Sequence, residues 1–409
     1  MRRVRFFYDV VCPYAYLAST QVDRLADELG VEIEWVPMLL GGIFREIGAP
    51  QVPAAHMSPA KARMNTLDLE RWARRWAVPF SFSPHHPQRS VEAMRLLCVT
   101  PPKLRPQVSA ALFSAYWAQG ARLDESLLTR VTETFQLGAQ EEPTPWKSAR
   151  AKEVLFSNTA EAAKLGVFGA PAFEVEGEIF WGQDRLHLVR EALGGTKQTW
   201  IEGLAPPETE VTLYHDFSSP FSYLASTQAQ ALIEKYGARL TWKPILLGAL
   251  FKEIGAPDVP LLAMSSPKRR YMGKDLQDWA KWWGVPFHFA KVFPLRTPTA
   301  LRVALIDPST TPAIYRAAWA EGIDIGAPEV LAQFLDREGY DGASLIEQTQ
   351  RPEIKNMLRE NTAEAQERGA FGVPSFELKR SGEPPQMYWG QDRLGLLSEA
   401  LVKPLKIIG

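Results

Sequence analysis

The chain has 409 residues, a formal net charge of −1 and a pI near 6.6. This balance predicts no affinity for nucleic acid or for anionic membrane surfaces, and no apolar stretch approaches the roughly 18 residues of a membrane span. The length favours two or three domains, each able to bury a sizeable core. Local basic clusters could still bind a small anion.

The cysteine content favours a reducing compartment. Cys12 and Cys98 alone cannot form the disulfide framework of a small secreted domain. Near the N-terminus, Arg5 and Asp9 interrupt the apolar run, so this stretch reads as a first strand rather than a signal peptide. We therefore expect a cytoplasmic protein. Cys98 lies in an apolar helical run and is expected in the core.

An internal repeat organises the chain. Residues 8–21 recur as residues 215–228, with Cys12 aligned on Ser219 and a shift of 219 − 12 = 207 positions. The same shift maps Trp35 on Trp242, and later motifs recur with small length changes. Similarity at a fixed long period indicates a duplicated domain.

Each copy of the repeated motif places a polar side chain before a proline. Pro is favoured in the first turn of a helix, where its missing N–H would have had no partner. A side chain just before it faces the free N–H groups and the positive end of the helix dipole. A thiol there, as in Cys12, should lose its proton more easily. A hydroxyl there, as in Ser219, can stabilise the thiolate of another molecule.

The order of predicted elements indicates an α/β fold. A strand, an amphipathic helix ending at Gly30 and a strand over 31–36 form a βαβ unit. A long helical stretch, a β-hairpin and a terminal helix follow. This order predicts two tandem thioredoxin-like domains, each with an inserted α-helical domain. The expected boundaries are 1–195 (insertion 41–160), a linker over 196–209, and 210–409 (insertion 248–365).

Two further features bear on the motif and the helices. Asp9 and Asp216 are expected to orient the motif loops, because Asp readily accepts hydrogen bonds from nearby backbone N–H groups. His215 either contacts the site or packs within its strand.

The tryptophans at helical spacing in both halves are expected in the core: Trp72, Trp76, Trp279 and Trp283.

Three motifs follow one another in each half. The second half has Asp216-Phe217-Ser218-Ser219-Pro220-Phe221-Ser222-Tyr223, Gly372-Val373-Pro374 and Trp389-Gly390-Gln391-Asp392-Arg393. The first half has counterparts around Cys12, Pro171 and Asp184. Together they resemble the DsbA-like thioredoxin superfamily, in its branch of 2-hydroxychromene-2-carboxylate isomerases and kappa-class glutathione transferases. The resemblance covers both halves almost end to end.

This resemblance implies a site for glutathione or another low-molecular-weight thiol. The serine at position 219 is implied to hydrogen-bond to the sulfur, with Cys12 in the same place in the first half. The peptide bonds before Pro171 and Pro374 are implied to be cis, so that the backbone of Ala170 and Val373 contacts the thiol ligand. Asp184 and Asp392 are implied to bind the γ-glutamyl amine, with assistance from Gln183 and Gln391. Lys61 and Lys268 are implied to bind a carboxylate of the ligand. The family's Asn after the second strand is absent around Pro50 and Pro257, which leaves the identity of the thiol open.

Three functions compete. The first is a thiol-dependent isomerase or transferase acting on a conjugated or aromatic small molecule, in which a thiolate adds reversibly to a double bond. The second is a thiol-disulfide oxidoreductase that uses Cys12 as a monothiol, because Ala15 stands where a resolving Cys would be. The third is a non-catalytic binding or scaffold protein.

Two expectations concern metals and assembly. His85-His86 has no further ligands at metal-binding spacing, so no metal site is expected. Because members of the family usually pair, the duplication suggests that the two halves pack as an intrachain pseudo-dimer.

Overall fold

The computed structural model describes residues 2–138, 143–197, 200–257 and 259–402. The chain forms two compact units. Unit 1 comprises residues 1–57, 65–198 and 264–272, and unit 2 comprises residues 58–64, 199–263 and 273–409. Each unit therefore contains a short segment from the other repeat.

A mixed four-stranded sheet forms the centre of unit 1. Its strands are β1 (Arg3–Tyr8), β2 (Glu32–Pro37), β3 (Ala172–Val175) and β4 (Glu178–Trp181), in the order β2-β1-β3-β4. The pair β1–β2 is parallel, and the helix α1 (Pro13–Leu29) connects its strands. The pairs β1–β3 and β3–β4 are antiparallel. The βαβ unit and the later hairpin predicted from the sequence are both confirmed.

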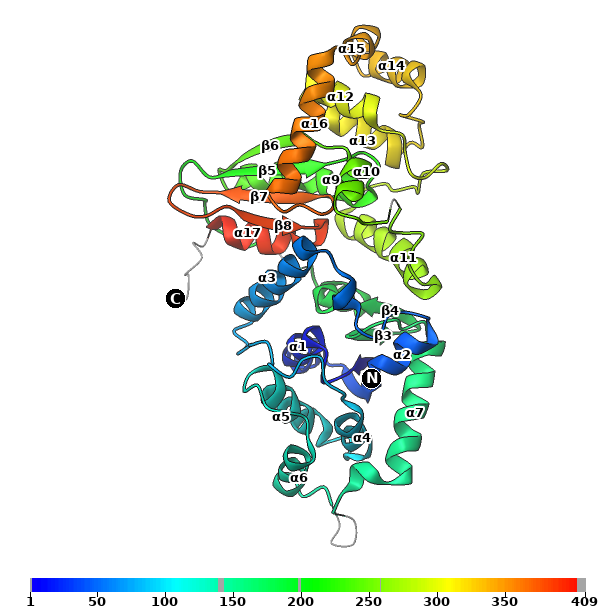
Figure 1. Ribbon diagram of the computed structural model, residues 1–409, viewed down its shortest axis with the longest axis vertical. Helices are drawn as coiled ribbons and strands as arrows, with labels where there is room; N and C mark the ends of the chain where they lie inside the picture. The colour runs from blue at the N-terminus through cyan, green and yellow to red at the C-terminus, as the bar shows by residue number, and fades with distance from the viewer. Residues whose placement is uncertain (1, 139–142, 198–199, 258, 403–409) are drawn as a thin grey trace. The chain divides into compact units, whose positions relative to one another are not determined.

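Unit 2 repeats this sheet (Figure 1). Its strands are β5 (Glu210–His215), β6 (Arg239–Pro244), β7 (Ser375–Lys379) and β8 (Gln386–Trp389), in the order β6-β5-β7-β8. The helix α9 (Pro220–Lys235) connects the parallel strands β5 and β6. Since both sheets have the same order and directions, the prediction of two tandem α/β repeats is confirmed.

Helices separate the second and third strands of each sheet. In the first repeat these are α2 (Leu40–Glu46), α3 (Pro59–Arg75), α4 (Val91–Val99), α5 (Arg105–Trp117), α6 (Glu125–Thr134) and α7 (Ala149–Lys164). In the second repeat they are α10 (Leu247–Glu253), α11 (Ser266–Trp283), α12 (Pro298–Ile306), α13 (Thr311–Trp319), α14 (Pro328–Arg337), α15 (Gly342–Gln348) and α16 (Pro352–Glu367). Figure 1 shows α12 to α16 grouped together beyond the sheet of unit 2.

Each repeat ends in a one-turn helix and an α-helix. In unit 1, η3 (Gln183–Arg185) leads into α8 (Leu186–Ala192) and packs against α1. In unit 2, η5 (Gln391–Arg393) leads into α17 (Leu394–Val402) and packs against α9. The end of each repeat is thereby brought to the helix that begins with its Pro motif.

The tryptophans at helical spacing pack as expected. Trp72 and Trp279 are 7% and 5% exposed, and each lies with its ring centroid 4.8 Å from that of the next tryptophan along the helix, Trp76 or Trp283. Trp279 belongs to the apolar core of the helical part of unit 2. These residues therefore stabilise the helical region.

Candidate thiol-binding site

Cys12 and Ser219 each precede a helix. They are the N-cap residues of α1 and α9, with nearly equal backbone angles (φ −94°, ψ 113° and φ −97°, ψ 115°). Each is 5% exposed. The Ser219 hydroxyl oxygen accepts a hydrogen bond from the N–H of Ser222 at 3.1 Å. The sequence thus placed both side chains correctly at helix N-termini, and the serine additionally caps its helix.

A buried aspartate holds each motif loop. The Asp9 carboxylate accepts hydrogen bonds from the N–H of Val11 at 3.2 Å, the N–H of Leu40 at 2.9 Å and the Ser90 hydroxyl at 3.1 Å. Asp216 accepts equivalent bonds from Ser218 and Leu247, at 2.9 Å and 2.8 Å. Burial raises the pKa of Asp9 to about 6 and also raises the pKa of Asp216. The predicted orienting role of both aspartates is confirmed.

The residue before each cis proline faces the N-cap side chain. The peptide bonds before Pro171 and Pro374 are cis, as the resemblance implied. The Cys12 thiol donates to the carbonyl oxygen of Ala170 at 3.1 Å, and the Ser219 hydroxyl donates to that of Val373 at 3.2 Å. Within the described residues, the backbone N–H groups of Ala170 and Val373 have no acceptor. A buried N–H without an acceptor is rare and suggests a ligand contact.

The Trp-Gly-Gln-Asp-Arg motif is tied to the cis-proline loop. Gly182 donates its N–H to the carbonyl oxygen of Pro171 at 2.9 Å, and Gly390 donates to that of Pro374 at 2.9 Å. Both glycines have positive φ, 107° and 105°, and a Cβ there would lie 2.4 Å from an aspartate oxygen. Glycine is therefore required for this turn to hold the aspartate in place. These aspartates are Asp184 and Asp392, which form ion pairs with Arg185 at 3.0 Å and with Arg393 at 3.1 Å.

Buried donors without acceptors gather at the same motif. Gln183 and Gln391 are 3% and 2% exposed. The Nε2 atom of each has no hydrogen-bond partner in the part of the chain that the structure describes. The same holds for the indole nitrogens of Trp181 and Trp389. Leaving a buried donor unpaired costs about 1–3 kcal/mol, so these groups point to an acceptor supplied by a ligand. The resemblance indicated the glutamines, but the tryptophans were missed.

Each predicted lysine lies over one of these tryptophans. In unit 1, Lys268 Nζ is 5.2 Å from the ring centroid of Trp181. In unit 2, Lys61 Nζ is 5.9 Å from that of Trp389. Both lysines are half-buried, and burial lowers the pKa of Lys61. Unit 1 therefore combines Cys12 with Lys268, and unit 2 combines Ser219 with Lys61.

The sequence predicted a Cys12 thiol that loses its proton easily, but the pKa of this thiol is raised. Burial raises its pKa to about 12, which outweighs the opposing effect of the nearby backbone N–H groups of Ala15 and Tyr14. Desolvation disfavours the charged thiolate more than the helix terminus favours it. Cys98 is 6% exposed and contacts the carbonyl oxygen of Pro37 at 3.9 Å, so its predicted place in the core is confirmed.

His215 belongs to the packing of its strand. It is fully buried, its Nδ1 lies 3.0 Å from the hydroxyl of Tyr315, and its ring packs against Phe217 and Trp242. Burial lowers its pKa to about 3, so the ring is neutral at physiological pH. Of the two alternatives left open by the sequence, the structure favours strand packing.

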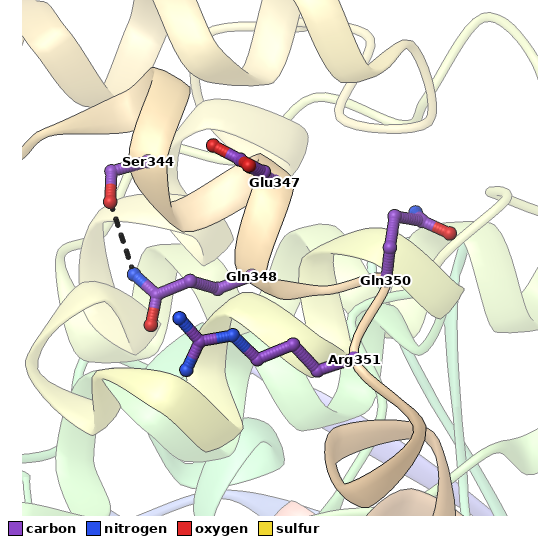
Figure 2. A pocket seen from close by; sticks show the side chains of 5 residues that line it. All are labelled: Ser344, Glu347, Gln348, Gln350 and Arg351. Atoms are coloured by element: carbon purple, nitrogen blue, oxygen red, sulfur yellow. Dashed lines mark hydrogen bonds between the residues drawn. The ribbon is translucent and has the colours of Figure 1, made fainter.

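A surface hollow of about 500 Å³ lies elsewhere in unit 2 (Figure 2). Its lining residues come from α15 and the turn after it: Ser344, Glu347, Gln348, Gln350 and Arg351. Gln348 Nε2 donates to the Ser344 hydroxyl at 3.2 Å. None of the predicted thiol-binding residues lines this hollow, so it is separate from the candidate site.

Metal-binding clusters and membrane-spanning helices were considered over the described residues. Within residues 2–138, 143–197, 200–257 and 259–402, no group of three or more His, Cys, Asp or Glu side chains could hold a metal ion. Over the same residues, no helix has the length and apolar character needed to cross a membrane.

Comparisons with known proteins match each repeat separately. The model of the DSBA-like thioredoxin domain matches residues 3–194 and again residues 210–402. A 2-hydroxychromene-2-carboxylate isomerase of Pseudomonas putida is 30% identical over 200 residues, which cover 47% of this chain and 93% of that protein. Glutathione S-transferase kappa 1 of Caenorhabditis elegans is 27% identical over 207 residues, covering 47% and 90%. A solved 2-hydroxychromene-2-carboxylate isomerase structure is 28% identical, covers 47% and 93%, and has a TM-score of 0.40.

Proposed function

Because the chain belongs to the DSBA-like thioredoxin domain family, we propose that it is a glutathione-dependent isomerase or transferase that binds its thiol cofactor at the N-terminus of α9. Both curated relatives named above are enzymes, one an isomerase and the other a glutathione transferase. The observation that carries the proposal is the buried Gln391 Nε2, which has no acceptor among the described residues; Gln391 lies in η5, which packs against α9. A peptide-like thiol with carboxylate and carbonyl groups would provide acceptors for such donors.

The residues of unit 2 fit glutathione group by group. The Val373 N–H, which finds no acceptor in the described part of the chain, can donate to a peptide carbonyl, and the Asp392 carboxylate can accept from the γ-glutamyl amine. Gln391 and Lys61 can bind a carboxylate. The Ser219 hydroxyl, which donates to the carbonyl oxygen of Val373, would turn its proton toward the sulfur. This arrangement would place a hydroxyl donor and the N-terminus of α9 beside the thiolate.

Bound glutathione would supply a nucleophile that adds reversibly to an electron-poor double bond of a conjugated or aromatic substrate. The Ser219 hydroxyl and the positive end of the α9 dipole would stabilise the sulfur's negative charge before the attack and after its expulsion. Free glutathione has a thiol pKa near that of cysteine, about 8.5, so a modest shift makes it largely ionised at neutral pH.

The monothiol oxidoreductase is the weaker alternative. A disulfide exchange at Cys12 needs its thiolate, and burial holds the pKa of that thiol near 12. A cytoplasmic location and an intrachain pairing of the two repeats stay predictions.

The test compares two serine variants of α9 in the full chain. Ser219→Ala removes the proposed sulfur contact, whereas Ser226→Ala removes a hydroxyl that donates to the carbonyl oxygen of Tyr223 at 2.7 Å on the same helix. With glutathione and 2-hydroxychromene-2-carboxylate as probes, we expect S219A to lower kcat by about 10²-fold and S226A to leave it unchanged. Absence of glutathione binding to the wild-type chain in calorimetry would refute the proposal.

A further inference from the structure

We propose that the two thiol sites exchange lysines, so that each site takes its carboxylate-binding cation from the opposite repeat. Lys268, from the second repeat, would serve the Cys12 site of unit 1, and Lys61, from the first repeat, would serve the Ser219 site of unit 2. The inference rests on the proposed function, because the ligand is the same glutathione.

In unit 1 the segment 264–272 packs onto Trp181, the first residue of the Trp-Gly-Gln-Asp-Arg motif. Lys268 lies over the Trp181 ring, and Tyr271, one helical turn later, accepts a hydrogen bond from the backbone N–H of Trp181 at 2.9 Å. Tyr271 is 7% exposed, with its ring centroid 5.3 Å from that of Phe168. The Trp181 indole nitrogen lies against Gly169, since a Cβ on that glycine would meet it at 2.6 Å. Lysine, indole N–H and cis-proline loop therefore adjoin one another.

In unit 2 the segment 58–64 occupies the equivalent place. Lys61 lies over the Trp389 ring, and Met64, again one turn later, is 6% exposed. Met64 belongs to a core cluster that contains Val373, the residue before the second cis proline. The Trp389 indole nitrogen lies against Gly372, where a Cβ would meet it at 2.9 Å. Both units thus share one arrangement.

The exchange is reciprocal. The difference 268 − 61 = 207 equals the shift that relates Ser219 to Cys12, so the two lysines are equivalent positions of the repeats. Lys61 forms no ion pair with any residue that the structure describes, and its ammonium group is half-buried beside an indole N–H without an acceptor. A cation without an ion pair and an N–H donor without an acceptor, both among the described residues, together fit a carboxylate. Each repeat would therefore need the other for a complete thiol site.

The test reads the two sites separately in one protein. The full chain is labelled with 5-fluorotryptophan, and the fluorine signals of two of its 13 tryptophans are assigned with W181F and W389F. Titration with reduced glutathione then gives one affinity from the Trp181 signal and another from the Trp389 signal. The variants are K268M and K61M, with K268R and K61R as controls that keep the charge.

Exchange predicts that K268M weakens the affinity reported by Trp181 by about tenfold and leaves the Trp389 value unchanged, whereas K61M does the opposite. The arginine variants should retain most of the affinity. The reverse assignment, or no effect of either lysine, would overturn the exchange while leaving glutathione binding intact. If glutathione shifts neither signal in the wild-type chain, both the exchange and the proposed function are wrong.

Discussion

The thiol of Cys12 donates a hydrogen bond to the carbonyl oxygen of Ala170, the residue before a cis proline, at 3.1 Å. Ser219 and Val373 make the same contact at 3.2 Å in the other unit. The two sites therefore differ at this position in one atom, sulfur or oxygen, on nearly the same backbone. This matched pair allows a thiol and a hydroxyl to be compared at the same burial and at the same kind of helix terminus.

The first prediction concerns the reactivity of Cys12. Because burial raises its pKa to about 12, the rate of alkylation by iodoacetamide should be far below that of free cysteine at pH 7.5 and should still rise above pH 9. The folded pKa lies above the unfolded value of about 8.5. The neutral thiol's contribution to stability is thus fully present below about pH 8.5 and is lost as pH rises toward 12. Mass spectrometry of the Cys12 peptide measures the rate, and a plateau below pH 8 would contradict the assignment.

The second prediction concerns Gly390. Its backbone (φ 105°, ψ 146°) lies in a region open essentially to glycine alone, and a Cβ would meet the Asp392 carboxylate at 2.4 Å. Gly390→Ala should lower the free energy of unfolding by about 1–3 kcal/mol and abolish glutathione binding. Gly369→Ala is the matched control, because it has φ 91° but a Cβ there meets nothing within 4 Å. Equal binding by the two variants, measured by calorimetry, would exclude a role for the Asp392 position.

The third prediction separates binding from stability at Gln391. Because its buried Nε2 has no acceptor in the described protein, Gln391→Leu should leave the free energy of unfolding unchanged or raise it by about 1 kcal/mol. Glutathione affinity should fall by about tenfold. Urea unfolding and calorimetry provide the two readouts.

Thr310→Val is the control for this variant. Thr310 is fully buried in unit 2, and its hydroxyl donates to the carbonyl oxygen of Asp307 at 2.7 Å. Its loss should lower stability by about 1 kcal/mol without changing affinity. A large loss of stability in Q391L would show that the amide has a partner within the protein.

The repeat, the βαβ units and the positions of Cys12 and Ser219 were all predictable, because they depend on local patterns: a Pro after an N-cap and alternating strand residues. Two short helices, α6 and α15, lie inside the predicted helical insertions but were not predicted individually, although Asp124 and Asp341 cap them by accepting from the N–H groups of Leu127 and Ser344. An Asp followed by a helical apolar pattern could have found them.

Other features depend on the folded chain and have no local signal. The pKa of Cys12 is set by burial, which the sequence motif does not reveal. The placement of Lys61 beside Trp389 and of Lys268 beside Trp181 depends on contacts between segments more than 80 positions apart along the chain, as 268 − 181 = 87 shows. The tryptophans could have been found, since each begins a motif that the resemblance singled out.

The fourth prediction concerns Asp9 and pH. Burial raises its pKa from 3.8 to about 6, so its contribution to stability is full below about pH 4 and is lost as pH rises through 6. Relative to Asp9→Asn, the wild-type chain should therefore lose about 3 kcal/mol of unfolding free energy between pH 4 and pH 7. Urea unfolding of both proteins at several pH values measures this difference. A difference that does not change with pH would show that the Asp9 carboxyl titrates normally.

The most direct measurement is the thiol pKa of glutathione bound to the Cys12→Ala chain, followed by the ultraviolet absorbance of the thiolate. If α9 and Ser219 stabilise the thiolate, this pKa should lie about 1–2 units below the value of about 8.5 in water, and S219A should return it toward that value. A bound thiol that titrates near 8.5 in both proteins would contradict the central claim that Ser219 holds a thiolate.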